Sequence, residues 1–563
     1  MTTVTVAAIE AIAPKTEFST PTRIWETIRD EKRAEQISRI PEDWRLQLAQ
    51  FPGEATVDVR PIAASSGILT HRELEITGDK YDATSLAAEI ARGTYTAVET
   101  VTAFCKRAAI CQQLCSALTE IFFADAIEKA KKLDEHFTTT GKTVGPLHGL
   151  PMTFKECFHV KGYDASNGYI SRCFEPSTTT TPMIQLVEKA GAVVIAKTNV
   201  PQTMLVAECE NNVFGRTRNP VVSHLSCGGS SGGEGALSAF RGNALGIGTD
   251  VGGSIRLPAA FNGVYGYKPS VGVLPFIGYA ASGWTGVNTG IPAVLGPLAH
   301  SIRDMRLLTE TVRAAQPWLF DPAVIPGVME QPAPTPGHQP VVGILTQSGV
   351  TPHPPVLRAI QMAKSKLESA GFTTRDFTPT CPSFSTIREI SAHLFTVDGA
   401  SYPRRELGKA GEPVVSSVKK FGFWGMPRKT HEEMWAWNTK KGEWQKAMLD
   451  AWQQLGIDVL VCPAAPHAAI SPEETTKELY TVAWNAVDYP AIIMPFTTVD
   501  PALDKKKDAF EPQDETDQKI QALYNPELMA GAPVSLQIVA PRLQDAALLR
   551  YAEELDKVLN SIE

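Results

Sequence analysis

Residues 226–258 constrain the chain more than any other stretch, and they read SCGGSSGGEGALSAFRGNALGIGTDVGGSIRLP. Two glycine-serine clusters, Gly228 to Gly233 and Gly252 to Ser254, flank a segment rich in alanine, leucine and isoleucine. A flexible linker would not carry so many apolar residues, so the stretch indicates buried, folded backbone. Glycine allows positive φ and close approach to the main chain, and free N–H groups beside a serine suit an oxyanion hole for acyl transfer.

Other glycine-rich motifs do not fit these clusters. Neither cluster ends in the Lys-Ser or Lys-Thr of a phosphate-binding loop, and Gly-Ile-Gly at 246–248 lacks the third glycine of a dinucleotide fingerprint. The Gly-x-Ser-x-Gly elbow is absent because Ser254 is followed by Ile255 and Arg256. A serine nucleophile still needs a base, and neither cluster contains a histidine.

The stretch resembles the signature of the amidase signature family, GGSSGGE followed by GxGTDxGGSIRxPA, almost letter for letter. The family's upstream lysine is matched by Lys155, within the segment Gly149 to Glu156. The resemblance extends from about Trp25 to the C-terminal helix and is nearest to the fungal acetamidase-like general amidases. It implies one compact α/β domain, with a central mixed, mostly parallel twisted sheet covered by helices on both faces.

The residues themselves suggest a catalytic arrangement that the resemblance repeats. Ser254 lies in the tighter turn and is the better nucleophile, which leaves Ser230 as a relay and Lys155 as the candidate base. The resemblance implies a Ser-Ser-Lys triad with an acyl-enzyme on Ser254 and with Ser230 in a cis Gly-Ser peptide. Lys155 would also return a proton to the leaving amine through Ser230.

Two further groups of residues are expected around the triad. The resemblance places Met204 where the family's backbone contacts the substrate and steadies the relay serine; an ordinary core methionine is the alternative. The expected substrate-binding and oxyanion-hole residues are Met204, Ser230, Val251, Gly252, Gly253 and Ser254. The expected supporting residues are Ser231, Asp250 and Arg256.

Lys155 can act as a base only if its amine is neutral, whereas an ordinary lysine has a pKa of about 10.4. Leu150, Met152 and Phe154 surround the position with apolar groups, so we expect a buried lysine with a lowered pKa. In a short strand over 152–155, the adjacent Glu156 points to the other face.

Hydrophobic periodicity and turn residues predict an alternation of helices and strands, typical of a parallel sheet covered on both faces. The predicted helices cover residues 22–38, 85–92, 97–114, 124–137, 183–190, 355–370 and 546–559, with Asp545 as N-cap of the last. The predicted strands cover residues 152–155, 192–196, 246–248, 341–345, 459–462 and 531–539.

The length of 563 residues would allow two to four domains, and the composition, 43% apolar and 20% charged, is that of a globular protein. Following the resemblance, residues 1–80 are expected to form an N-terminal helical extension packed on the core. Residues 81–563 are then expected to form the amidase signature domain, with the catalytic core at about 145–300. The proline-rich segment 316–340 and the polar segment 499–519 are surface excursions.

Composition also excludes several partners. The net charge of −8, without a basic tract, argues against nucleic acid. No secretory signal and no apolar run of about 18 residues is visible. We therefore expect a cytoplasmic protein that does not associate with a membrane. The nine cysteines are scattered without zinc-ligand spacing, and no metal or cofactor is expected. The expected partner is a small-molecule amide substrate, and a homodimer is left open.

The predicted function is hydrolysis of small carboxylic amides to a carboxylate plus ammonia or an amine. The alternatives are a carbamate, ester or anilide hydrolase of the same family and a glutaminase subunit of a transamidation complex. A catalytically dead scaffold disagrees with the intact Lys155, Ser230 and Ser254. Five aromatic residues are expected to wall the pocket: Tyr279, Trp284, Phe423, Trp424 and Trp435.

Overall fold

The computed structural model describes residues 24–51, 53, 57–284, 286–287, 289–330, 338–472, 474, 480–506 and 510–561. Parts of three predicted segments therefore lie outside the described residues: 1–23, 52 and 54–56 of the N-terminal extension, 331–337 of the proline-rich segment, and 507–509 of the polar segment.

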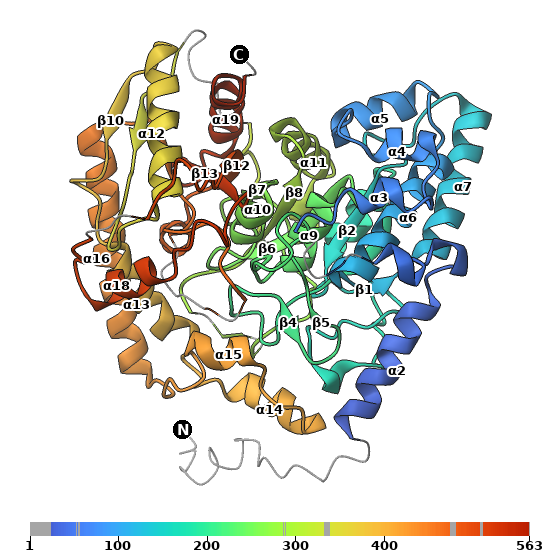
Figure 1. The fold of residues 1–563 in the computed structure, drawn as a ribbon, viewed down its shortest axis with the longest axis horizontal. Helices are drawn as coiled ribbons and strands as arrows, with labels where there is room; N and C mark the ends of the chain where they lie inside the picture. Colours follow the sequence, from blue (N-terminus) through green and yellow to red (C-terminus); the bar gives the residue numbers. More distant parts are fainter. Residues whose placement is uncertain are drawn as a thin grey trace, which may run out of the picture.

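A single large sheet runs through the molecule (Figure 1). Its strands follow the order β1-β3-β2-β6-β8-β7-β12-β13-β11-β9-β10, and β4 and β5 form a separate small pair. The strands are β1 Leu118–Ile121, β2 Pro151–Lys155, β3 Val193–Thr198, β4 Glu210–Asn211, β5 Gly215–Arg216, β6 Leu245–Asp250, β7 Tyr265–Lys268, β8 Val294–Ala299, β9 Val342–Ile344, β10 Thr374–Asp376, β11 Val459–Pro463, β12 Ala491–Thr498 and β13 Pro533–Val539.

Pairing within the sheet is mixed. β3, β2 and β6 are parallel neighbours, and so are β11, β9 and β10. The remaining neighbours, from β6 through β8, β7, β12 and β13 to β11, and β1 with β3, are antiparallel. The predicted mixed sheet flanked by helices is confirmed, and its parallel pairing is concentrated in the two runs named first.

Helices pack along this sheet (Figure 1): α9 contacts β2, β3, β6 and β8, while α10 contacts β7, β12 and β13. The helices are α2 Trp25–Ser38, α3 Ile62–Ser65, α4 His71–Thr77, α5 Ala83–Ala91, α6 Ala97–Cys115, α7 Phe123–Thr140, α8 Pro182–Lys189, α9 Gly232–Ala239, α10 Arg256–Asn262, α11 Ile302–Ala314, α12 Pro354–Ser369, α13 Phe384–Phe395, α14 Ser401–Ala410, α15 Ser416–Phe421, α16 His431–Leu455, α17 Val482–Ala486, α18 Glu515–Ala522 and α19 Asp545–Leu559, with short 3-10 turns η1 Glu42–Trp44, η2 Leu48–Gln50, η3 Ile170–Arg172 and η4 Pro317–Leu319.

Local sequence explains several element boundaries. Thr96 opens α6 and Thr430 opens α16, and Glu99 and Glu433 complete a capping box at each helix. The prediction that Asp545 caps the last helix is wrong, because α19 begins at Asp545 itself. The Asp545 carboxylate instead accepts hydrogen bonds from the Tyr267 hydroxyl at 2.5 Å and from the Ser270 N–H at 2.9 Å.

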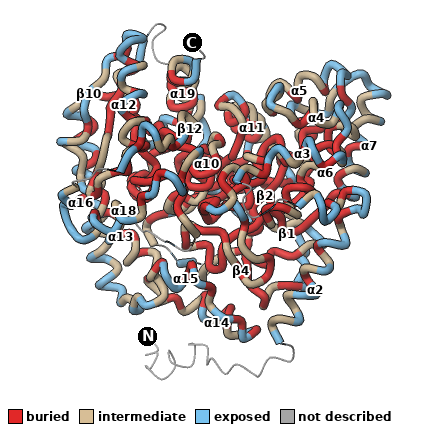
Figure 2. The backbone as a smooth tube through the Cα atoms, viewed as in Figure 1, coloured by how far each residue is buried: buried red, intermediate tan, exposed pale blue. Residues whose placement is uncertain are grey.

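Buried residues gather at the centre of the molecule, around β2 and α10, while the outer helices such as α16 carry the exposed positions (Figure 2). Every residue of β2, β3 and β6 is buried, so side chains at the ends of these strands lie away from bulk water. In the part of the chain that the structure describes, no helix combines the length and apolar character needed to cross a bilayer.

Segments from the N-terminal 80 residues pack on the rest of the chain. α2 contacts β1, at one edge of the sheet, as well as η3, and α3 and α4 contact α6 (Figure 1). The division of the chain at residue 80 stays a prediction.

Candidate active site

The sheet brings the predicted lysine to the predicted serine. Lys155 is the last residue of β2, which lies between β3 and β6, and β6 leads directly into the second glycine-serine cluster. Parallel strands end at the same edge, so Lys155 lies near the end of β6. The Lys155 Nζ lies 2.7 Å from Ser230 Oγ and 2.9 Å from Thr249 Oγ1.

Lys155 is fully buried, as predicted from its apolar neighbours. Burial lowers its pKa to about 8, and nearby Cys157, Asp250, Cys209 and Glu234 raise it by less. Burial also raises the pKa of the Cys157 thiol to about 11 and that of the Glu234 carboxyl to about 8, so both groups are mostly neutral near pH 7. A neutral lysine amine is therefore accessible at mildly alkaline pH.

The Glu156 side chain contacts other residues than those around Lys155. This agrees with the expectation that neighbouring strand residues point to opposite faces. The Glu156 carboxylate accepts hydrogen bonds from the Ser166 N–H at 2.7 Å and the Ser166 hydroxyl at 2.8 Å. It also contacts Lys197 Nζ at 3.2 Å. The charge of Glu156 is thus compensated away from Lys155.

The first glycine-serine cluster turns into the N-terminus of α9. The peptide between Gly229 and Ser230 is cis, as the family resemblance implied. A Cβ at Gly229 would lie 2.3 Å from the Glu208 carbonyl oxygen, so glycine is required there. Ser231 is buried, and its N–H donates to the Ser254 carbonyl oxygen at 3.0 Å, which joins the two clusters.

The second cluster presents Ser254 at the wall of a pocket. Among the described residues, the Ser254 hydroxyl makes no hydrogen bond. Gly253 has a φ of +131°, and its N–H donates to Asp250 Oδ1 at 2.8 Å. The predicted oxyanion hole therefore loses the Gly253 N–H, whereas the N–H groups of Val251, Gly252 and Ser254 have no hydrogen-bond partner within the described ranges.

A buried ion pair holds this turn from inside. Arg256 donates to Asp250 at 2.9 and 3.0 Å, and both side chains are fully buried. Arg256 also donates to Asn485 Oδ1 at 2.6 Å, to the Thr481 carbonyl oxygen at 2.8 Å and to Gln537 Oε1 at 2.9 Å. Burial alone would raise the pKa of Asp250, but the Arg256 guanidinium and a hydrogen bond from the Asn485 amide hold it well below its usual range, so this carboxylate stays charged.

An inner pocket of about 70 Å³ opens at Ser254. Its walls are mostly apolar, with Leu205, Phe395 and Phe423 among the lining residues. Met204 also lines this pocket, and Met204 and the preceding Thr203 both have positive φ, at 58° and 74°. The chain is thus sharply bent where it borders the pocket.

An outer chamber of about 700 Å³ shares five lining residues with the inner pocket: Leu205, Val206, Val251, Phe395 and Phe423. Tyr279, Trp284, Phe423 and Trp424 line this chamber, as predicted. The prediction is wrong for the fifth residue, Trp435. It lies on α16, is 62% exposed and lines neither the inner pocket nor the outer chamber.

Several residues of the site were missed from the sequence. Thr249, which contacts Lys155, stands directly before Asp250 inside the second motif, and its position could have been noticed there. Thr481, Asn485 and Gln537 lie more than 220 residues further along, and only the fold brings them to Arg256. Within the described ranges, no group of three or more histidine, cysteine, aspartate or glutamate side chains could hold a metal ion.

Comparisons with known proteins agree with this geometry. The family model named Amidase matches residues 99–549. The acetamidase of Emericella nidulans is 37% identical over 556 residues, covering 96% of this chain and 99% of the relative. The acetamidase of Aspergillus oryzae is 36% identical over 552 residues, with the same coverage. The solved structure of a fatty acid amide hydrolase matches with a TM-score of 0.89 and 28% identity, covering 97% of this chain and 98% of that one. The chain therefore belongs to the Amidase family of amide-hydrolysing enzymes.

Proposed function

We propose that the protein hydrolyses small carboxylic amides through an acyl-enzyme on Ser254, with Ser230 as relay and Lys155 as base. The observation that carries this proposal is the 2.7 Å contact between Lys155 Nζ and Ser230 Oγ, in a buried position beside Ser254. The lowered pKa of Lys155 supports it, because about half of the amine is neutral near pH 8.

The reaction follows from these contacts. Neutral Lys155 accepts the proton of Ser230, which accepts the proton of Ser254, while Ser254 Oγ bonds to the amide carbon. The C–N bond then breaks, and the leaving nitrogen takes a proton from Ser230, which Lys155 replaces. Water attacks the resulting ester by the same route in reverse, releasing the carboxylate and free Ser254.

Backbone groups stabilise the oxyanion in this proposal. The N–H groups of Val251, Gly252 and Ser254 border the nucleophile, whereas the N–H of Gly253 is used by Asp250. Donors fixed in advance cost no reorganisation when charge develops, and each is worth about 2.7–4 kcal/mol of transition-state stabilisation. Asp250, Arg256 and Ser231 act by holding these donors in place.

The dimensions of the two spaces suggest which end of the substrate goes where. An apolar inner pocket of about 70 Å³ suits a short aliphatic acyl group. The outer chamber, at about 700 Å³ and walled by Trp284 and Trp424, has room for a larger aromatic leaving group. Anilides and aryl esters are therefore the second candidate substrates.

Labelling followed by intact-mass analysis tests the proposal. A fluorophosphonate should add once to the wild-type protein, at Ser254 by peptide mapping, and not to Ser254→Ala. An adduct on Cys157 or Cys227 would instead contradict the serine mechanism. Product release from acetamide, longer aliphatic amides, anilides, ethyl carbamate and glutamine then ranks the substrates, and preference for glutamine would favour the transamidation alternative.

A further inference from the structure

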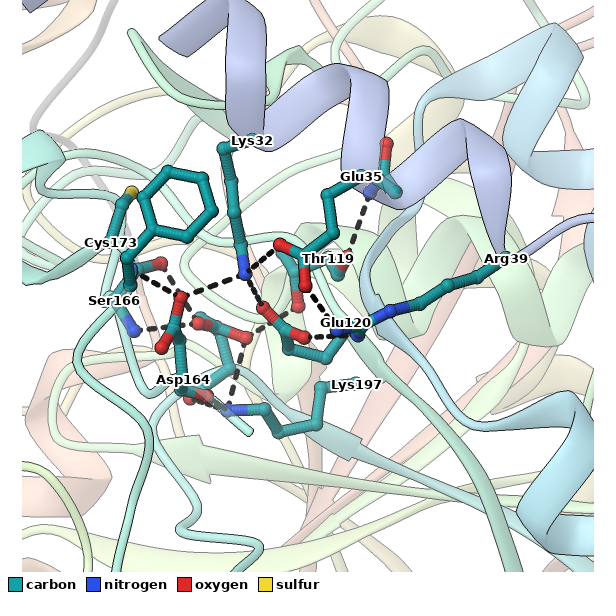
Figure 3. A network of polar contacts seen from close by, with 12 residues as sticks. Lys32, Glu35, Arg39, Thr119, Glu120, Asp164, Ser166, Cys173 and Lys197 are labelled. Carbon is teal, nitrogen blue, oxygen red and sulfur yellow. Dashed lines mark hydrogen bonds and ion pairs between the residues drawn. The ribbon is translucent and has the colours of Figure 1, made fainter. Parts of the chain in front are cut away.

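A buried network of charges lies beside the residues that follow the strand of Lys155, and Figure 3 shows its members. It joins α2 to the sheet edge and to the turn that follows β2. Its charged members are Lys32, Glu35, Arg39, Glu120, Glu156, Asp164 and Lys197. We call this set the ion network.

At its outer end, α2 supplies the cations. Lys32, only 2% exposed, places its Nζ 2.6 Å from Glu120 Oε1, 2.7 Å from Asp164 Oδ2 and 2.8 Å from Glu35 Oε2. Arg39, the residue after the end of α2 and seven positions after Lys32, contacts the other oxygen of Glu120 at 2.6 Å. These carboxylates raise the pKa of Lys32 above its ordinary value, so Lys32 stays charged throughout the working pH range.

At the inner end of the ion network, Lys197 binds the backbone that follows Lys155. Its Nζ donates to the carbonyl oxygens of Glu156 at 3.0 Å and Phe158 at 3.1 Å, and to that of Asp164. Lys197 lies on β3 and pairs in register with Phe154, so it acts from the strand beside the catalytic one. One ammonium group thus fixes the turn at the C-terminal end of β2.

The same turn supports the wall of the outer chamber. The Cys157 carbonyl oxygen accepts a hydrogen bond from the Ala280 N–H at 2.7 Å, and Phe158 forms an isolated β-bridge with Tyr279. Tyr279 lines the outer chamber. A displacement of the turn would therefore move the catalytic amine and one side of the chamber together.

Stability alone gives a weak reason for such a network. Four carboxylates and three cations are taken largely out of water, and replacing a buried ion pair with apolar residues of similar volume is often neutral or stabilising. In some proteins buried ionic groups instead specify one conformation of the chain around them. Here the contacted segment starts at the residue next to Lys155.

We infer that Lys197 and Lys32 are positioning residues: the ion network holds the end of β2 so that Lys155 Nζ stays in contact with Ser230. The N-terminal helix α2, which carries Lys32, then helps to hold Lys155 in place. This inference rests on the proposed role of Lys155. Misplacing a reacting group by about 1 Å can cost on the order of 100-fold in rate.

The test compares Lys32→Met and Lys197→Met with a matched control, Lys106→Met. Lys106 also pairs with a glutamate between two helices, with Nζ 2.8 Å from Glu73 Oε1 and a side chain 17% exposed, but no described contact joins it to the active site. We expect all three variants to lower Tm. Only the first two should lower kcat by about 10-fold or more at a temperature where each is folded.

The pH profile provides a readout that lost stability would not move. Loosening the turn admits water to Lys155, which weakens the desolvation that lowers its pKa. The midpoint of the kcat/KM profile should therefore move to higher pH in Lys32→Met and Lys197→Met, and stay in place in Lys106→Met. Thr119→Val, which removes only a hydroxyl that donates to Glu156, gives a milder variant should the lysine variants not fold.

Two results separate this inference from the proposed function. If the network variants lose Tm like Lys106→Met yet keep the wild-type kcat and midpoint, the ion network is only structural and the inference is wrong. If Lys155→Met itself retains activity, the proposed function fails, and the network has no catalytic group to position.

Discussion

Arg256 Nη2 and Asp250 Oδ1 lie 2.9 Å apart at fully buried positions, directly below the turn that carries Ser254. Asp250 also accepts hydrogen bonds from the N–H groups of Gly253 and Ile255, at 2.8 and 3.1 Å. The Asp250 carboxylate therefore holds the Arg256 side chain and also the backbone on either side of Ser254.

Removing the guanidinium should destabilise the protein strongly. Arg256→Met leaves Asp250 charged, buried and without its cation, a change that costs about 3–5 kcal/mol in comparable buried pairs. Urea unfolding measures the difference. Arg29→Met, which breaks the exposed pair of Arg29 with Asp30, is the control and should change stability by about 0.5 kcal/mol or less. A variant that unfolds at the wild-type urea concentration would show that Asp250 is satisfied without Arg256.

The sequence motifs located the candidate site residues but not the residues that hold them in place. Lys155, Ser230 and Ser254 stand in short motifs whose glycines and hydroxyls indicate acyl transfer, and the fold brings Lys155 to Ser230 as predicted. Asn485 lies in no recognised motif, and the strand that contains Gln537 was predicted as a structural strand without a contact to Arg256. Only the strand order, with β13 next to β12 and β11, places Gln537 at the arginine.

Backbone donors show the same limit. The motif predicted that the Gly253 N–H would be free to bind an oxyanion. The turn instead brings it to the Asp250 carboxylate three residues earlier, and it donates a hydrogen bond there. Regular elements were easier: residues 97–114 and 152–155 were found almost to the residue, as α6 and β2. The antiparallel run β8-β7-β12 was not predicted: β7 is only four residues long, Gly296 and Pro297 interrupt β8, and Pro495 interrupts β12.

Gly253 should not tolerate a side chain. Its φ of +131° disfavours any L residue, and an added Cβ would lie 2.2 Å from Thr481 Oγ1 and 2.8 Å from Thr481 Cβ. Gly253→Ala should therefore lower both Tm and kcat, because the turn has to shift. Gly442→Ala is the opposite control: nothing lies within 4 Å of the added Cβ, and alanine in the exposed interior of α16 should stabilise by about 0.5–1 kcal/mol. Equal behaviour of the two variants would contradict this account.

Acid should destabilise the protein through two buried histidines. His353 and His467 lie with ring centroids 5.9 Å apart, and burial lowers their pKa values to about 3 and about 4. Between these values and the ordinary histidine pKa of about 6.5, the unfolded chain binds more protons than the folded one. Stability should then fall as pH drops below 6.5, by up to about 1.4 kcal/mol per pH unit for each histidine. In His467→Phe, the slope of unfolding free energy between pH 6.5 and 4 should be smaller; an unchanged slope would assign the acid sensitivity to other groups.

The last prediction concerns the ionisation that controls turnover. Burial lowers the pKa of Lys155 to about 8, and the base form is the neutral amine, so kcat/KM should rise with pH through about 8 and level off above it. Lys155→Met should cost several orders of magnitude and remove this inflection from the residual activity. Lys155→Arg should do no better, because guanidinium does not lose its proton in this range. The matched control is Lys268, a second fully buried lysine whose pKa burial also lowers to about 8, but whose Nζ donates to the Pro269 carbonyl oxygen. Lys268→Met should keep the inflection whatever it does to stability. If the inflection vanishes in Lys268→Met and survives in Lys155→Arg, the base that activates Ser254 is not Lys155, and the 2.7 Å contact with Ser230 has only a structural role.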